Sequence, residues 1–117
     1  MKVFAVFLVS QIGDKYVATT RTDGTLGLAG GKLDSGETPQ QALLREVSEE
    51  GWKLPDDVQL TLVHQQLVDG NICQWYQSNQ SPVQLNSYKE MKRGIKPVLI
   101  SKKQLIDSGM GNQNLKL

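Results

Sequence analysis

The sequence predicts an α/β fold, and three observations support this prediction. An uninterrupted apolar run at Val3–Val9 is typical of a buried strand. Residues 39–50 have the spacing of an amphipathic helix. Two strand-like segments, 58–68 and 72–77, flank Asp69-Gly70, which is a strong signal for a two-residue hairpin turn. Strands on both sides of one well-marked helix indicate a sheet with a helix packed on it.

The beginning of this helix is clear in the sequence. Thr38 is a suitable N-cap, Pro39 suits the first turn, and Gln41 lies three residues after Thr38, as a capping box requires. Apolar side chains form a stripe along one flank, at Leu43, Leu44 and Val47. We therefore expect a helix over residues 39–50 that buries this stripe in the core.

Three carboxylates gather on another flank of the same helix. Because residues three and four apart share a helix face, Glu46, Glu49 and Glu50 converge. Like charges at these spacings destabilise a bare helix by about 0.2–0.5 kcal/mol per pair, so a divalent cation between them accounts for the pattern. Hard carboxylate oxygens favour magnesium, or manganese in its place. Taken alone, such an acidic flank is more often a solvated surface.

The segment before the helix supplies the second half of the pattern. Glycines at positions 30, 31 and 36 allow the backbone to bend tightly and to approach a ligand closely. Arg45 is placed to pair with Glu49 or with Glu37, and would orient carboxylates rather than touch a substrate. A glycine loop followed by an acid-lined helix suits a metal-bound phosphate, so phosphate-ester chemistry is the leading hypothesis.

These residues resemble the signature of the Nudix hydrolases, G-x5-E-x7-R-E-U-x-E-E-x-G-U, in which U is a bulky aliphatic residue. The match begins at Gly31 and is close through Glu50. The run from Gly30 to Pro39 looks like the MutT-type branch in particular. The resemblance implies an α/β/α sandwich around a mixed β-sheet, with the loop and helix as the catalytic element.

The resemblance also implies an activity, namely magnesium-dependent hydrolysis of a nucleoside diphosphate linked to another moiety by attack of water at phosphorus. The favoured reaction converts a nucleoside triphosphate, or a modified one, to the monophosphate and pyrophosphate. Dinucleoside polyphosphates, nucleotide sugars and capped RNA ends stay open as substrates, because the signature does not encode the leaving group. A non-catalytic nucleotide-binding module is the alternative, but it would predict a damaged ligand set, whereas all three helix glutamates are intact.

Site residues follow from the resemblance position by position. The metal ligands would be the three helix glutamates, 46, 49 and 50, together with the backbone carbonyl of Gly30. Arg45 and Glu37 resemble the structural pair, with Gly36 supporting the loop. The general base stays open between Glu46, Glu49 and Glu90. Glu90 is a candidate because it is the only glutamate after Glu50 and lies between a loop and a strand.

Candidate substrate contacts are less sharply defined. We expect Gly31 and Lys32 in the loop to contact substrate, and Arg21 at the end of the second strand to meet phosphate. Asn112 resembles in placement a base-contacting asparagine of the MutT-type branch. Weaker candidates for phosphate or base contact, each more often surface or core, are Lys92, Arg93, Lys96, Trp75, Tyr76 and Tyr88.

The end of the signature departs from the family pattern. Trp52 and Lys53 stand where a glycine and an aliphatic residue are expected, while a glycine comes one place early, at Gly51. A one-residue deletion after Glu50 explains this difference. Gly51 would then end the helix, and Trp52 would fill the aliphatic position.

The rest of the chain predicts shorter elements. Residues 11–15 form a turn, after which residues 16–20 form a strand that pairs back on Val3–Val9 as a hairpin. Residues 78–87 lack a clear period and predict a loop. A short strand at 97–100 and a short helix at 102–106 complete the pattern.

Length, composition and charge limit the domain organisation and the partners that the chain can have. A chain of 117 residues, 38% hydrophobic, agrees with a single domain over residues 1–117. A formal net charge of +1 argues against general attraction to nucleic acid or membrane, so a small-molecule nucleotide is the expected partner.

The N-terminal apolar run is too short to span a membrane, which suggests a cytoplasmic protein. Cys73, the one cysteine, is expected to be buried and structural. The chain is expected to be a monomer or a homodimer.

Overall fold

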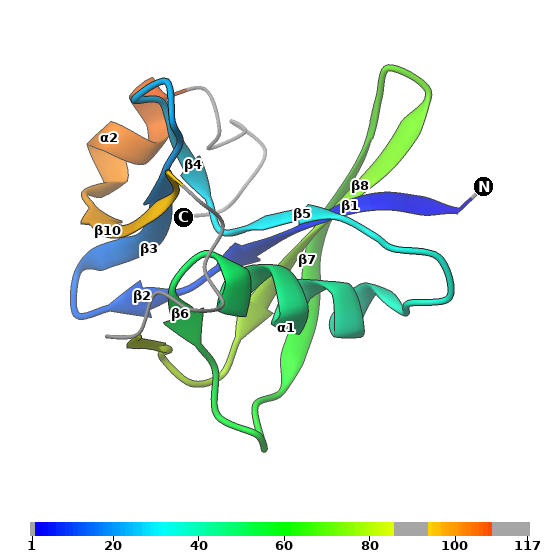
Figure 1. The fold of residues 1–117 in the computed structure, drawn as a ribbon, viewed down its shortest axis with the longest axis horizontal. Coiled ribbons are helices and arrows are strands. Elements are labelled where there is room, and N and C mark those ends of the chain that lie inside the picture. The colour runs from blue at the N-terminus through cyan, green and yellow to red at the C-terminus, as the bar shows by residue number, and fades with distance from the viewer. Residues whose placement is uncertain (1, 86–93, 109–117) are drawn as a thin grey trace.

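The computed structural model describes residues 2–85 and 94–108 (Figure 1). The elements run in the order β1 (Val3–Val9), β2 (Gln11–Ile12), β3 (Lys15–Thr20), β4 (Leu26–Leu28), β5 (Gly30–Lys32), α1 (Pro39–Glu49), β6 (Trp52–Lys53), β7 (Leu60–Val68), β8 (Asn71–Ser78), β9 (Val83–Gln84), β10 (Lys96–Ile100) and α2 (Lys102–Asp107). The predicted α/β class is confirmed.

The main sheet is mixed and has the strand order β5-β1-β8-β7. β1 runs antiparallel to β5 and parallel to β8, and β8 returns antiparallel to β7. The turn between β7 and β8 lies at Asp69 and Gly70, with φ of 50° and 81°. Positive φ at both central residues matches the right-handed twist of the flanking strands, so the predicted hairpin is confirmed.

A second sheet is built around β3, which pairs with β10, β2 and β4. The predicted hairpin between Val3–Val9 and the second strand is wrong, because β2 is the hairpin partner of β3. Both edges of β1 are already occupied by β5 and β8, and the chain passes to the second sheet at Ser10, whose carbonyl accepts a hydrogen bond from Val17 N–H at 2.9 Å.

Five short strands were also missed from the sequence. β2 lies in the predicted turn at 11–15, β4 lies just before the glycine loop and β5 at its start. β6 follows α1 and pairs with β9, which lies in the predicted loop at 78–87. Two- and three-residue strands leave no hydrophobic period to detect, and their pairing depends on partners distant in the sequence. β5 matters most for the site, because its pairing with β1 fixes Gly30 and Gly31 on the main sheet.

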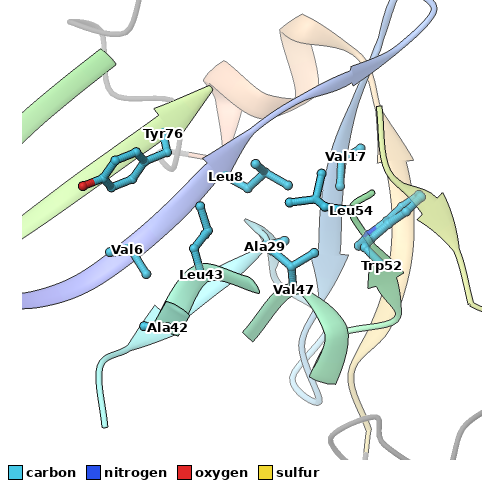
Figure 2. Packing of buried hydrophobic residues seen from close by; sticks show 10 residues of the cluster. All are labelled: Val6, Leu8, Val17, Ala29, Ala42, Leu43, Val47, Trp52, Leu54 and Tyr76. Atoms are coloured by element: carbon cyan, nitrogen blue, oxygen red, sulfur yellow. The ribbon is translucent and has the colours of Figure 1, made fainter. Parts of the chain in front are cut away.

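The two helices lie on opposite faces of β1. On one face, Val6 and Leu8 pack with Ala42, Leu43 and Val47 of α1 and with Trp52 and Tyr76 (Figure 2). The prediction that Leu44 belongs to the buried stripe is wrong, because its side chain points off this face and is 42% exposed. On the other face, Ala5 and Val9 pack in a second buried cluster that contains Leu105 of α2, together with Cys73 and Trp75. This arrangement is the predicted α/β/α sandwich around a mixed sheet.

Helix α1 begins as the sequence predicts and ends one residue earlier. Thr38 accepts a hydrogen bond from Gln41 N–H, and the Gln41 side chain accepts one from Thr38 N–H, which confirms the capping box. Glu50 is the C-cap, and Gly51 follows with φ of 93°, so the prediction that Gly51 ends the helix is confirmed. Trp52 is then turned into the core, where only 1% of it is exposed.

The predictions for the elements near the C-terminus and for Cys73 are confirmed. The strand and helix expected near the C-terminus are β10 and α2, and α2 starts with its own capping box between Ser101 and Gln104. Cys73 is 8% exposed, and burial raises the pKa of its thiol, as expected for a structural residue. Among the described residues, none of the helices is long and apolar enough to cross a membrane.

Candidate active site

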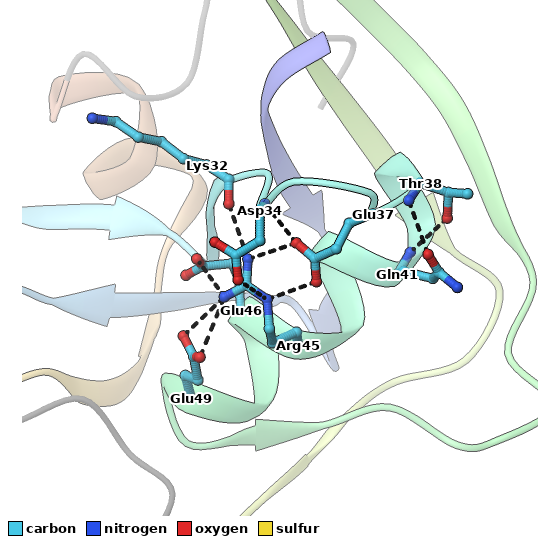
Figure 3. A network of polar contacts seen from close by, with 8 residues as sticks. All are labelled: Lys32, Asp34, Glu37, Thr38, Gln41, Arg45, Glu46 and Glu49. Atoms are coloured by element: carbon cyan, nitrogen blue, oxygen red, sulfur yellow. Dashed lines mark hydrogen bonds and ion pairs between the residues drawn. The ribbon is translucent and has the colours of Figure 1, made fainter. Parts of the chain in front are cut away.

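Arg45 is the centre of a network that ties the glycine loop to α1 (Figure 3). Its Nε and Nη2 donate to the two carboxylate oxygens of Glu37 at 2.8 and 2.9 Å, and Nη2 also donates to the Lys32 carbonyl at 3.0 Å. Its Nη1 donates to Glu46 Oε1 at 3.0 Å and to Glu49 Oε1 at 3.2 Å. Both partners predicted for Arg45 are therefore present.

The pKa values of Glu37 and Arg45 shift in the directions expected for an ion pair. Hydrogen bonds from Arg45, together with one from Asp34 N–H at 2.7 Å, hold the pKa of Glu37 below its usual range. The same contact with Glu37 raises the pKa of Arg45, so the guanidinium stays charged. Arg45 also lies 3.3 Å from Asp34 Oδ2, a contact that the sequence reasoning did not anticipate.

Glu50 joins the helix to β5 at a second point. The Gly30 N–H donates to both carboxylate oxygens of Glu50 at 3.3 Å. Glu50 is only 4% exposed, as is Glu46, although both are carboxylates. Gly30 has φ of 151°, and a side chain there would lie 2.1 Å from the Val6 carbonyl oxygen. Position 30 therefore requires glycine.

Gly31 leaves room for Glu46. A Cβ at position 31 would lie 2.6 Å from both the carboxylate carbon and Oε2 of Glu46. Gly31 faces α1 at this point, and its missing side chain is the space in which the Glu46 carboxylate lies. The glycine loop and the acidic flank of α1 thus fit together, as their spacing in the sequence suggested.

A pocket of about 400 Å³ opens beside Gly30 and Glu50. Arg21 lines it, so this predicted phosphate contact is brought close to the acidic group. The remaining lining residues were missed from the sequence, because no short motif links them; they are Thr19, Thr22, Leu28 and Ile95. They come together only because β3, β4 and the segment before β10 are neighbours in the second sheet.

Other predicted contacts lie elsewhere. The Lys32 ammonium lies 5.2 Å from the centre of the Phe4 ring, and in Figure 3 its side chain points away from the carboxylates. Trp75 and Tyr76 are 7% and 5% exposed, so both are core residues, as expected for aromatic side chains in strands. Several candidates lie outside the described residues, namely Glu90, Asn112, Tyr88, Lys92 and Arg93.

The donor set suits a hard divalent cation, although the carboxylates contact Arg45 here. Among residues 2–85 and 94–108, no three His, Cys, Asp or Glu side chains converge closely enough to hold a metal ion. In the ion pairs of those residues, one guanidinium is shared by four carboxylates, of Asp34, Glu37, Glu46 and Glu49. Negatively charged oxygen donors therefore outnumber the positive charge beside them, and such donors suit a hard divalent cation such as magnesium.

Comparison with known proteins identifies the family. The family model of the Nudix domain matches residues 1–91. The chain belongs to the Nudix family. It is therefore an enzyme of Nudix type, and the resemblance seen in the loop and helix extends over most of the chain. A search of the curated proteins found no match.

Solved structures show the Nudix fold as well. A Nudix hydrolase from Nitrosomonas europaea is 24% identical, with a TM-score of 0.69 over 92% of this chain and 78% of that one. A MutT structure, from work on Aliivibrio salmonicida and Vibrio cholerae, is 18% identical, with a TM-score of 0.63 over 92% and 86%. The Bacillus subtilis pyrophosphohydrolase BsRppH is 22% identical, with a TM-score of 0.60 over 84% and 62%.

Proposed function

We propose that this Nudix protein hydrolyses a nucleoside triphosphate, or a modified one, to the monophosphate and pyrophosphate, using magnesium or manganese. The observation that carries the proposal is the contact between the Glu50 carboxylate and Gly30 N–H, beside the pocket that Arg21 lines. Acidic groups that can hold a cation and an arginine that can hold phosphate then meet at one opening. MutT and a pyrophosphohydrolase are among the proteins of the same fold.

Each group has a distinct part in the proposed reaction. The carboxylates of Glu46, Glu49 and Glu50, with the Gly30 carbonyl, would hold the cation. When bound, the cation supplies Lewis-acid polarisation of a phosphoryl oxygen and a more acidic water. Arg21, which lines the same pocket, binds the phosphate chain. Arg45 and Glu37 orient the ligands and do not touch the substrate.

The attacking water needs a base, for which Glu46, Glu49 and Glu90 are the candidates. Arg45 Nη1 donates to Glu46 and to Glu49, so these two candidates lie side by side on α1. Glu90→Gln tests the third candidate. A lower rate with an altered pH profile would assign the base to Glu90, whereas an unchanged profile would leave Glu46 and Glu49.

Product analysis tests the function directly. The protein is incubated with magnesium and a panel of nucleoside triphosphates, oxidised nucleotides, dinucleoside polyphosphates and nucleotide sugars, with Glu50→Gln as the control. We expect metal-dependent release of a monophosphate and pyrophosphate by the wild type. Because the substitution removes a cation ligand, Glu50→Gln should lower turnover by about 10²-fold or more while the fold is kept. Equal rates in the two proteins would contradict the metal assignment.

A further inference from the structure

The outer edge of β7 is the side of this strand that faces away from β8. β7 ends the main sheet, and no strand of the described residues pairs with this edge. Its nine residues include no Asp, Glu, Lys, Arg or Pro. The edge strand of the second sheet, β10, has both Lys96 and Pro97. Because lysine and proline on an edge strand hinder pairing with another chain, β10 is protected in this way and β7 is not.

Exposed apolar side chains are concentrated on the same strand. Of the nine large hydrophobic residues that are exposed in the described part of the chain, four belong to β7, namely Leu62, Val63, Leu67 and Val68. Leu67 is 58% exposed and lies at the turn end of β7, where the β7–β8 hairpin extends away from the body of the molecule (Figure 1). Successive side chains point to opposite faces of a sheet, so Leu67 and Val68 leave apolar surface on both faces of the edge. Such a cluster indicates an interaction surface.

The backbone of this segment determines what the edge can bind. The two-residue turn after Val68 makes Val68 and Asn71 a hydrogen-bonded pair of the hairpin. Hydrogen-bonded and non-hydrogen-bonded pairs alternate along an antiparallel ladder, and the register with β8 is regular back to His64. The N–H and C=O groups of Gln65 and Leu67 therefore point to the outer edge. An extended strand is the partner that can pair with these groups.

We propose that β7 pairs with β7 of a second copy of this chain, antiparallel about a two-fold axis, over residues 64–68. The register with β8 shifts between Leu62 and His64, so residues 64–68 are the regular part of the strand. A pair centred on Gln66 places Gln65 of one copy opposite Leu67 of the other, which satisfies the outward-pointing groups of both copies. The two main sheets then form one continuous sheet, with the two β7 strands at its centre.

Charge favours a second copy as the occupant of this edge. Residues 64–68 include no Asp, Glu, Lys or Arg, so antiparallel pairing of two identical strands places no like charges opposite each other. The net charge of +1 adds little repulsion between copies. None of the described residues of the candidate active site lies on β7, so the inference does not depend on the proposed function.

Sedimentation equilibrium of the intact protein tests the pairing. We expect the wild type to have twice the chain mass of 13.0 kDa and to dissociate on dilution. Leu67→Lys places a charge on the edge and should give the monomer at the same concentration. The matched control is Leu99→Lys, which changes an exposed leucine of β10 and should leave the dimer intact.

Three results would overturn the inference. They are a monomeric wild type, a dimer that Leu67→Lys leaves intact, and loss of the dimer in both variants, because the effect would then not be specific to β7.

Amide hydrogen exchange of the wild type supplies a second readout, which decides if Leu67→Lys fails to fold. The N–H groups of Gln65 and Leu67 point to the outer edge, whereas that of Gln66 points to β8. We expect all three to exchange slowly in the dimer, and those of Gln65 and Leu67 to exchange about tenfold faster or more once dilution gives the monomer. Fast exchange of the Gln65 and Leu67 amides in the dimer would show that the copies meet elsewhere.

Discussion

Single residues at this site act mainly by the space that they leave and the charges that they share. Gly31 gives its side-chain volume to the Glu46 carboxylate, and Arg45 divides one positive charge among several carboxylates. The identity of both residues was evident from the sequence signature. The reason for the glycine was not, because the contact with Glu46 joins two segments that meet only when β5 packs on α1.

Gly31→Ala tests the fit between the loop and the helix. The added methyl group would lie 2.6 Å from the Glu46 carboxylate and displace it. We expect magnesium or manganese affinity, measured by calorimetry, to fall about 10–100-fold, as is typical when ligand positioning is lost. The matched control is Gly13→Ala, where φ is +62° and nothing lies within 4 Å of the new Cβ. That control should lose about 1 kcal/mol of stability through backbone strain and keep its metal affinity. Unchanged affinity in Gly31→Ala would refute the argument.

The Arg45–Glu37 pair predicts a pH dependence of stability. The pKa of Glu37 is lowered in the folded state, so the folded protein binds this proton less readily than the unfolded chain does. The resulting stabilisation is present above the unfolded pKa of about 4.3 and is lost as pH falls through the lower folded value. Urea unfolding of wild type and Glu37→Gln should show a stability difference at pH 7 that shrinks in this acidic window. A difference independent of pH would show that the pair acts only through its neutral contacts.

At the scale of elements, α1 is the best predicted part of the chain. Its capping box, apolar stripe and acidic flank all depend on spacings within about a dozen residues, so they can be read locally. The strands β4, β5, β6 and β9 are too short to carry a period, and each exists because of a partner elsewhere in the chain. Local patterns therefore defined the helix that carries the carboxylates, but not the strand that holds the glycines.

Thr38→Ala tests the start of this helix. The substitution removes the side-chain half of the capping box and should lower the free energy of unfolding by about 1 kcal/mol. Magnesium affinity should be retained, because the cap lies at the opposite end of α1 from Glu49. Ser101→Ala, which breaks the corresponding capping box of α2, is the control for a cap far from the carboxylates. A large loss of metal affinity in Thr38→Ala would show that the N-terminal turn also positions the ligands.

At the scale of the whole molecule, the pocket depends on how the two sheets sit against each other. Trp52 follows the C-terminal end of α1, packs with Val17 of β3 in one buried cluster, and donates its indole N–H to the Ala18 carbonyl. It therefore connects the helix that carries Glu50 to the sheet that carries Arg21. The altered end of the signature, where Trp52 fills the aliphatic position, is therefore the link between the two halves of the site.

Trp52→Phe tests this link by chemical denaturation. Loss of the hydrogen bond to Ala18 should cost about 1 kcal/mol of stability. Trp75→Phe, which removes an indole N–H without a partner, should cost less and serves as the matched comparison. If both substitutions cost the same, the Trp52 bond contributes nothing beyond the packing of its ring.

The sequence by itself determined the family, the helix with its cap, the β7–β8 hairpin and the carboxylates from 46 to 50, because each depends on residues close together in the chain. Only the tertiary structure decided the strand order, the Glu50–Gly30 contact and the neighbours of Arg21. These features join segments separated by long stretches of chain. Their pairing is set by which strand edges remain available and which faces must be buried, and neither can be read from a local pattern.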